Sequence, residues 1–236
     1  MTPQDGRSTT PHDESQRERH AAIRRSARDQ FDRWARTYDR SWLNELVFYP
    51  TIRICLAELT RWQQARGGGP FRLLDVGCGT GLLLRLLTRR ADAARLVGLD
   101  YSSEMLRRLT AAAAELPGGE RIVAVQGDAE RLPFADASFD LITCCNSFHH
   151  YPHQAAAVAD FHRVLRPGGR LILVDGFRDN VIGWVVFDVA VARVEGNVHH
   201  AAWSHVRRLI ETAGFRRVEQ RKVNVLAPLL VSVAQR

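Results

Sequence analysis

The sequence predicts an α/β fold, in which a mostly parallel sheet carries helices on both faces. Short apolar runs alternate with helix-like patterns between residues 71 and 175, and such alternation is typical of a parallel sheet. A glycine-rich turn follows the first run, and polar side chains end the others. The length of 236 residues suits one such domain with an extension.

The first predicted strand is the apolar run Phe71–Val76, which leads into a glycine turn. Gly77, Gly79 and Gly81 alternate along this turn, and the leucine-rich segment Leu82–Leu87 predicts a helix directly after it. Glycine lets a backbone come close to a ligand, and a helix N-terminus offers free N–H groups. The turn therefore favours a nucleotide-like ligand, with a ligand-free tight turn as the alternative interpretation.

Further strands and helices follow in order along the chain. We expect strands over 95–99, 122–125, 139–145 and 171–174, and helices over 102–114 and around 158–165. Pro117-Gly118-Gly119 and Pro167-Gly168-Gly169 end these two helices. A last helix over 203–213 ends at Gly214, and strands over 215–225 and 229–234 form an antiparallel pair joined at Pro228.

The chain before residue 67 predicts an extension in two parts. Residues 1–18 are polar, which is typical of a disordered tail, and 19–66 form a helical cap. A stripe at helical spacing marks the first cap helix: Ala27, Phe31, Trp34, Tyr38 and Trp42. This stripe either packs on the core or covers a ligand, with the Tyr38 hydroxyl pointing into the site. A second cap helix begins at Pro50, and the binding domain occupies 67–236, with a helical insertion over about 178–200.

The positive charge does not predict a nucleic-acid partner. The net charge is +7, but the only lysine is Lys222, and the remaining basic residues are arginines. Such a composition indicates a bias in residue usage rather than a phosphate-binding face. The arginines of the N-terminal segment are also interleaved with acids, which is typical of a solvated surface.

Cysteine usage and hydropathy predict a cytoplasmic chain without a transmembrane segment. The four cysteines form no C-x-x-C pair, which favours neither a disulfide nor a zinc or other metal site: Cys55, Cys78, Cys144 and Cys145. The N-terminus is polar and carries no signal peptide. The apolar stretch 181–194 contains Asp188 and is too short for a bilayer, which requires about 20 apolar residues.

Polar side chains end five of the predicted strands: Asp75, Asp100, Asp128, Asn146 and Asp175. Ligands of open α/β sheets bind beyond the carboxyl ends of the strands, so these side chains are expected on one rim. Asp100 can accept hydrogen bonds from both hydroxyls of a ribose. Asp128 can accept from an adenine amino group, with the Ala129 N–H as a donor. Each acid alone could equally be a helix cap or a turn residue.

The glycine loop distinguishes between nucleotide ligands. A dinucleotide fold requires G-x-G-x-x-G, which brings a helix N-terminus to a pyrophosphate. Here the loop is Gly77-Cys78-Gly79-Thr80-Gly81, and Asp75 lies two positions before it. A carboxylate at this place would repel a pyrophosphate and would suit an ammonium group. The ligand that fits is S-adenosylmethionine, an adenosine that carries an amino acid and no phosphate.

The same motifs resemble those of the class I S-adenosylmethionine-dependent methyltransferases, in particular the small-molecule group that includes the ubiquinone and menaquinone biosynthesis enzymes. The resemblance rests on Asp-Val-Gly-Cys-Gly-Thr-Gly (75–81), Gly-Asp-Ala-Glu-Arg-Leu-Pro-Phe (127–134), Ser-Phe-Asp-Leu-Ile (138–142) and Val-Leu-Arg-Pro-Gly-Gly (164–169). It implies a doubly wound, Rossmann-like sheet of seven strands whose last strand is antiparallel. The segments 144–150 and 40–44 depart from the quinone enzymes.

The resemblance also implies roles for individual residues. Gly77 and Gly79 would line the cofactor, with Asp75, Cys78 and Gly81 in the same motif. Asp100 would hold the ribose. The other cofactor residues are Tyr101 and Met105 beside the adenine, Asp128 and Ala129 at its edge, Asn146 and Ser147 beside the methionine, and Tyr38 closing over it.

Methyl transfer to a hydroxyl also needs a general base. The candidates are His149 and His150 after the fourth strand, with Tyr38 nearby, followed by His199 and His200. Alternatively, His149 and His150 shape the loop, and His199 and His200 form a surface turn. The helix expected over 181–194 either caps an apolar acceptor or is a core or dimer helix.

The resulting hypothesis is a methyltransferase that acts on a small apolar or aromatic molecule, as a monomer or a homodimer. A protein that binds S-adenosylmethionine without turnover is an alternative. An RNA methyltransferase and an NAD-type oxidoreductase are further alternatives. The nucleobase signature Asp/Asn-Pro-Pro-aromatic is absent after the fourth strand, which argues against DNA N-methylation.

Overall fold

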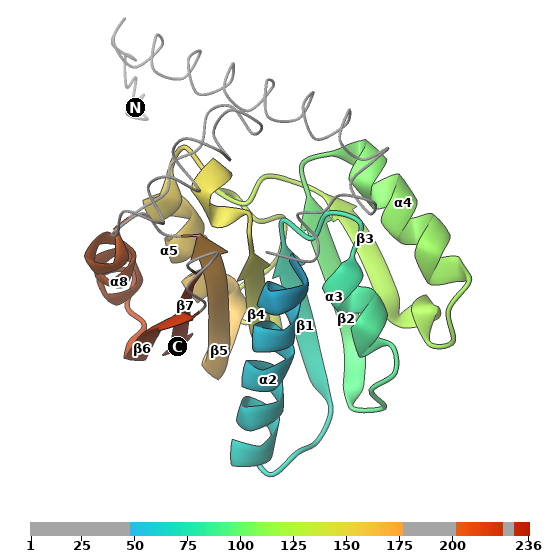
Figure 1. Cartoon of the computed structure of the whole chain (residues 1–236), viewed down its shortest axis with the longest axis horizontal. Coiled ribbons are helices and arrows are strands. Elements are labelled where there is room, and N and C mark those ends of the chain that lie inside the picture. The colour runs from blue at the N-terminus through green and yellow to red at the C-terminus, as the bar shows by residue number, and fades with distance from the viewer. Residues whose placement is uncertain (1–47, 177–201, 224–228) are drawn as a thin grey trace, which may run out of the picture.

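The computed structural model describes residues 48–176, 202–223 and 229–236, and these residues form a seven-stranded sheet (Figure 1). The strand order is β3-β2-β1-β4-β5-β7-β6. The strands are β1 (Phe71–Val76), β2 (Ala93–Asp100), β3 (Ile122–Gln126), β4 (Phe139–Cys145), β5 (Leu165–Gly176), β6 (Arg216–Val223) and β7 (Leu229–Gln235). Strands β1 to β5 are parallel, and β7 is antiparallel to both β5 and β6. The expected mixed sheet with an antiparallel last strand is confirmed.

Helices cover both faces of the sheet. The helices are α2 (Tyr49–Ala65), α3 (Leu82–Leu87), α4 (Ser103–Ala114), α5 (Gln154–Val164) and α8 (Trp203–Thr212), with 3-10 turns η3 (Gly119–Arg121) and η4 (Phe148–His150). One buried cluster joins α2, α3 and α4 to the sheet, and a second joins α5 and α8 to it. Neighbouring residues of β1 point to opposite faces, so Leu73 belongs to the first cluster and Leu74 to the second. The doubly wound architecture is therefore confirmed.

Helix α2 forms the described part of the N-terminal cap. Pro50 lies in its first turn, where the missing N–H of proline costs no helical hydrogen bond. Its apolar face includes Ile52, Cys55 and Leu59, which are buried against the sheet. The helix ends before glycines 67–69, which all adopt positive φ angles. Its start and its end agree with the prediction from the sequence.

Several local signals act as expected. Ser102 caps α4 by accepting a hydrogen bond from the Met105 N–H at 3.2 Å. Gly214 ends α8 with a φ of 98°. The predicted tail, the stripe with Tyr38, the helix over 181–194, His199, His200 and Pro228 lie outside the described residues.

Strand β5 is much longer than the sequence indicates. The prediction covers 171–174, whereas β5 runs from Leu165 to Gly176 and begins directly after α5. Pro167-Gly168-Gly169 therefore lies inside the strand, at a register shift between β4 and β5. The extra residues pair with neighbours that are distant in the sequence, such as Arg170 with Gln235. A local apolar pattern cannot reveal such pairing.

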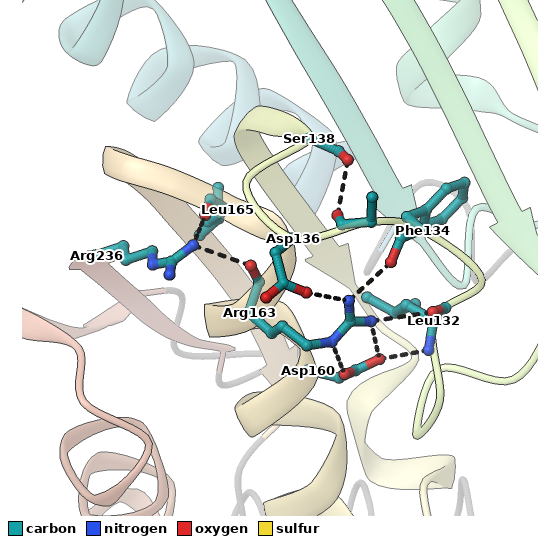
Figure 2. A network of polar contacts seen from close by, with 9 residues as sticks. Leu132, Phe134, Asp136, Ser138, Asp160, Arg163, Leu165 and Arg236 are labelled. Atoms are coloured by element: carbon teal, nitrogen blue, oxygen red, sulfur yellow. Dashed lines mark hydrogen bonds and ion pairs between the residues drawn. The ribbon is translucent and has the colours of Figure 1, made fainter.

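The segment between β3 and β4 is fixed to α5 by Arg163 (Figure 2). The Arg163 guanidinium donates hydrogen bonds to the carbonyls of Phe134 at 2.8 Å and Leu132 at 3.1 Å. It also pairs with Asp160 at 2.6 Å and with Asp136 at 2.8 Å. The Leu132 N–H in turn donates to Asp160. These contacts hold a segment whose other end reaches the carboxyl edge of the sheet.

In the part of the chain that the structure describes, no helix is long and apolar enough to cross a bilayer.

Candidate functional site

A cavity of about 380 Å³ lies at the carboxyl ends of the central strands. It brings together most of the cofactor residues expected from the sequence: Asp75, Gly77, Cys78, Gly79, Asp100, Tyr101, Met105, Asp128, Ala129, Asn146 and Ser147. Five side chains were expected at the strand ends, and Asp175 is the one of them that does not line the cavity. The expectation that strand-end side chains share one rim is therefore confirmed for four of the five.

The glycine loop comes very close to the segment after β4. Gly77 has a φ of 70°, and a Cβ at this position would lie 2.3 Å from the Ser147 Oγ. The N–H groups of Gly77 and Cys78 both donate to the Leu99 carbonyl, at 2.8 and 3.1 Å. By contrast, among the described residues a Cβ at Gly79 would meet nothing within 4 Å beyond its own chain neighbours. The loop thus needs glycine at Gly77 for packing, and it leaves open space beside Gly79.

Gly81 has a packing role in the structure and does not line the cavity. Its φ is 75°, and a Cβ here would lie 2.1 Å from the Leu109 Cδ1. Gly81 precedes α3, and Leu109 belongs to α4. The third glycine therefore lets these two helices approach each other. The sequence pattern of alternating glycines could not separate this role from ligand binding.

Asp75 is a buried carboxyl at the end of β1. Its side chain accepts a hydrogen bond of 2.6 Å from the Thr143 Oγ1 on β4. Burial raises the pKa of Asp75 to about 7, the Thr143 hydrogen bond opposes this change, and the charge of Asp100 adds to it. Near neutral pH the carboxyl is therefore only partly ionised, and a cationic group placed beside it would favour the ionised form.

Asp100 connects the glycine loop to α4. One carboxylate oxygen accepts from the Gly79 N–H at 2.8 Å, and the other accepts from the Ser102 N–H at 2.9 Å. The two backbone bonds fix the carboxylate at the rim of the cavity.

Asp128 and Ala129 follow β3 on the far side of the cavity. The Asp128 Oδ1 accepts from the Glu130 N–H at 2.9 Å, which forms a tight turn. Beyond this turn, Leu132 belongs to the Arg163 network of Figure 2. Met105 of α4 also lines the cavity and is buried. A flat aromatic ring would therefore meet polar groups at its edge and an apolar side chain on its face.

A cluster of hydroxyl groups lines the cavity just after β4. The Ser147 Oγ donates to the Val76 carbonyl at 3.1 Å and lies 2.8 Å from the Tyr151 Oη. Asn146 adopts a φ of 53°, and its side chain accepts from the Thr51 Oγ1 of α2 at 3.3 Å. Burial raises the pKa of the Tyr151 phenol, which keeps it protonated. Sequence reasoning missed Tyr151, although it follows Asn146 and Ser147 closely.

The structure separates the two adjacent histidines. His149 is buried, and its Nδ1 lies 2.6 Å from the Asp175 Oδ1. The His149 N–H donates to the other Asp175 oxygen at 3.0 Å. His150 lines the cavity, and its ring centroid lies 4.0 Å from that of His149. Asp175 therefore holds His149 behind His150, and His149 does not line the cavity.

Helix α2 and helix α3 contribute lining residues that the sequence did not indicate. Phe48, Tyr49 and Ile52 come from the start of α2, and Arg85 comes from α3. The signal for the first three was the helix start at Pro50, which gave no direction for their side chains. Arg85 lies in a leucine-rich helix, where periodicity alone suggested only packing.

Comparison with known proteins shows that part of this chain is similar to methyltransferases. Residues 74–173 match the family described as "Methyltransferase domain". A demethylmenaquinone methyltransferase from Deinococcus radiodurans is 40% identical over 114 residues, which cover 48% of this chain and 46% of that protein. A demethylmenaquinone methyltransferase from Thermotoga maritima is 35% identical over 150 residues, which cover 61% of this chain and 59% of that protein. The chain thus spans about half the length of these curated relatives.

Solved structures share the fold at low sequence identity. A putative methyltransferase from Haloferax volcanii, solved in complex with the Trm112 methyltransferase activator, superposes with a TM-score of 0.69 and 20% identity, covering 89% of this chain and 96% of that chain. This likeness concerns the fold alone. Taken with the family match and the sheet order, residues 74–173 resemble a class I S-adenosylmethionine-dependent methyltransferase domain, and the similar proteins include menaquinone-biosynthesis enzymes.

Proposed function

We propose that this protein transfers a methyl group from S-adenosylmethionine to a small apolar or aromatic acceptor. The observation that carries the proposal is the cavity itself, because one space holds both acidic strand ends and an apolar and hydroxyl-bearing wall. When bound, S-adenosylmethionine supplies an electrophilic methyl group on a sulfonium. The residues of the chain would bind and align the two partners.

The charges of the cavity support S-adenosylmethionine rather than a dinucleotide. Four acidic side chains line it: Asp75, Asp100, Asp128 and Glu130. A pyrophosphate would be repelled by this set, whereas a sulfonium and an ammonium would be attracted. The free space beside Gly79 supports a ligand that lies directly against the loop. The residues present therefore fit the cofactor of the family.

The hydrogen-bond capacity of the rim supports a specific placement of the nucleoside. Asp100 would accept from the ribose hydroxyls, since its carboxylate is held at the rim of the cavity by the Gly79 and Ser102 N–H groups. Asp128 and the Ala129 N–H would meet the adenine edge, and Tyr101 and Met105 would flank the ring. Asp75 would then face the ammonium group.

The acceptor side of the cavity is apolar. Phe48, Tyr49 and Ile52 at the start of α2 line the same cavity as Pro152 and His150. An apolar wall favours an apolar or aromatic acceptor, because burial of such a molecule releases water from both surfaces. The relatives named demethylmenaquinone methyltransferases support the same class, since their names specify a quinone-type acceptor.

For a hydroxyl acceptor, His150 is the general base that we propose. It lines the cavity, and His149 lies behind it with its ring held by Asp175. His149 would act by fixing the position of His150. Alignment of the acceptor with the methyl group can account for roughly 7–11 kcal/mol of the barrier.

Tyr38 of the N-terminal segment is proposed to close over the cofactor.

The first test is calorimetry of the full chain with S-adenosylhomocysteine and with NAD. We expect the first ligand to bind and the second not to bind, and Asp100→Ala should abolish binding of the first. Uptake of NAD in place of S-adenosylhomocysteine would overturn the proposal.

The second test supplies S-adenosylmethionine with a deuterated methyl group and a panel of lipophilic phenols, reduced quinones and RNA. Mass spectrometry should find the label in a phenol or quinol, and label in RNA alone would overturn the acceptor class.

A further inference from the structure

Arg85 is the only arginine or lysine among the described residues that line the cavity. The same lining carries four acidic side chains, so the guanidinium is an isolated positive charge in an acidic space. Arg85 lies on α3, directly after the glycine loop, and Leu82 and Leu83 of that helix line the cavity with it. Because helical side chains lean toward the N-terminus of their helix, Arg85 extends back toward the rim.

The Nε of Arg85 is buried and has no hydrogen-bond partner among the described residues. Buried donors are almost always satisfied in folded proteins, so such a group calls for a partner that the protein alone does not provide. Arg90 gives a contrast on the same segment, because it forms two hydrogen bonds with Asp92, at 2.7 and 2.9 Å. Two other described side chains carry a buried atom without a partner, Gln63 and Gln220, and neither lines the cavity.

We propose that Arg85 binds the α-carboxylate of the cofactor's amino-acid end. This inference rests on the proposed function, in which S-adenosylmethionine occupies the cavity. That ligand ends in an ammonium and a carboxylate, and the ammonium is matched by Asp75. The carboxylate needs a cation at the same end of the cavity, and Arg85 is the side chain that supplies it. A guanidinium can hold a carboxylate through two parallel hydrogen bonds, which fixes its orientation as well as its charge.

The assignment makes Arg85 a specificity residue. Asp100, Asp128 and Met105 would bind any adenosine, whereas Arg85 would select one that carries a carboxylate. The matching pair of probes is S-adenosylhomocysteine and its decarboxylated form, S-adenosyl-3-thiopropylamine. The two molecules share the nucleoside, the sulfur and the amine, and they differ only in the carboxylate.

The test is calorimetry of both probes on the full-length wild type and on Arg85→Met. We expect the wild type to prefer S-adenosylhomocysteine by roughly tenfold or more, the value for a hydrogen-bonded charged pair. Arg85→Met should bind that probe roughly tenfold more weakly and should bind the decarboxylated probe with nearly wild-type affinity. The preference for the carboxylate would then disappear. Arg85→Lys should restore part of it, because it keeps the charge and loses the paired geometry.

Arg89→Met is the matched control, since Arg89 is exposed one turn later and does not line the cavity. It should bind both probes as the wild type does, and thermal unfolding of each unliganded variant checks the fold. Unchanged binding of S-adenosylhomocysteine to Arg85→Met would overturn the inference, as would an equal loss of affinity for both probes. If the wild type binds neither probe, the proposed function itself fails. The two failures are thus distinguishable.

Discussion

Thr143 on β4 donates a hydrogen bond of 2.6 Å to the buried carboxyl of Asp75 on the neighbouring strand β1. This bond stabilises the ionised carboxyl, yet burial has the larger effect and raises the pKa of Asp75 to about 7. The site therefore holds a carboxyl that is only partly ionised at neutral pH. A cationic ligand beside it would complete the ionisation.

Binding of S-adenosylhomocysteine should therefore strengthen as the pH rises from about 5.5 to about 8. At a pH below the Asp75 pKa of about 7, the ligand ammonium must displace a proton from this carboxyl. Each unit by which the pH falls therefore lowers the affinity by up to about tenfold. Calorimetry at several pH values, in two buffers of different ionisation enthalpy, measures both the affinity and the released proton. Asp75→Asn removes the titrating group and should bind more weakly with little slope. An unaltered slope in Asp75→Asn would contradict this assignment.

The same carboxyl predicts how the unliganded protein responds to pH. Its folded pKa of about 7 lies above the unfolded value of about 3.9, so the folded state binds the proton more tightly. The contribution of Asp75 to stability is therefore greatest below about pH 4 and decreases as the pH rises toward 7. Thr143→Val should raise the pKa further, and the decrease should then extend to higher pH. Urea denaturation of the wild type and of Asp75→Asn at each pH isolates this contribution.

Gly77→Ala should destabilise the unliganded protein more than Gly79→Ala. Both positions have positive φ angles, of 70° and 54°, so each substitution carries a backbone cost of about 1–2 kcal/mol. Only at Gly77 would the new methyl overlap a side chain, that of Ser147, which adds about 1–3 kcal/mol. Urea denaturation measures the difference. Equal losses in the two variants would show that the contact with Ser147 relaxes freely.

Arg163→Met should lower both stability and cofactor affinity, because Arg163 fixes the segment that ends at Asp128 (Figure 2). We expect a loss of about 2–3 kcal/mol in the free energy of unfolding, since two carbonyls lose a charged donor. Arg166→Met is the control, because Arg166 is similarly exposed and pairs with Asp140 at 3.0 Å instead. It should leave the affinity for S-adenosylhomocysteine unchanged. The same affinity in both variants would remove the proposed link between the network and the adenine edge.

His149→Ala should mainly lower stability, whereas His150→Ala should mainly lower turnover. His149→Ala leaves the buried Asp175 without its imidazole partner and should lower the free energy of unfolding by about 2–3 kcal/mol. His150→Ala should change stability by less than about 1 kcal/mol and should lower turnover of a hydroxyl acceptor at unchanged cofactor affinity. Chemical denaturation and single-turnover kinetics make the comparison. Full turnover in His150→Ala would eliminate it as the general base.

Much of the site could be derived from the chain order alone. The apolar runs and glycine breaks are local patterns, and they located β1, β4 and α4 almost to the residue. Because parallel strands end at one edge, the order of the strands alone predicts that Asp75, Asp100 and Asp128 lie together, and they line one cavity. The length of β5 was not predictable, since its first residues are strand only through pairing with β4 and β7.

The sequence by itself determined the order of the elements, the glycine loop and the acids at the strand ends, because each is encoded in a few neighbouring residues. Only the tertiary structure decided which of two adjacent residues faces the cavity. It turned His150 inward and His149 toward Asp175, directed Gly81 against Leu109, and brought Arg85 to the rim. These outcomes depend on the direction of single side chains and on partners far away in the chain, and no local pattern carries that information.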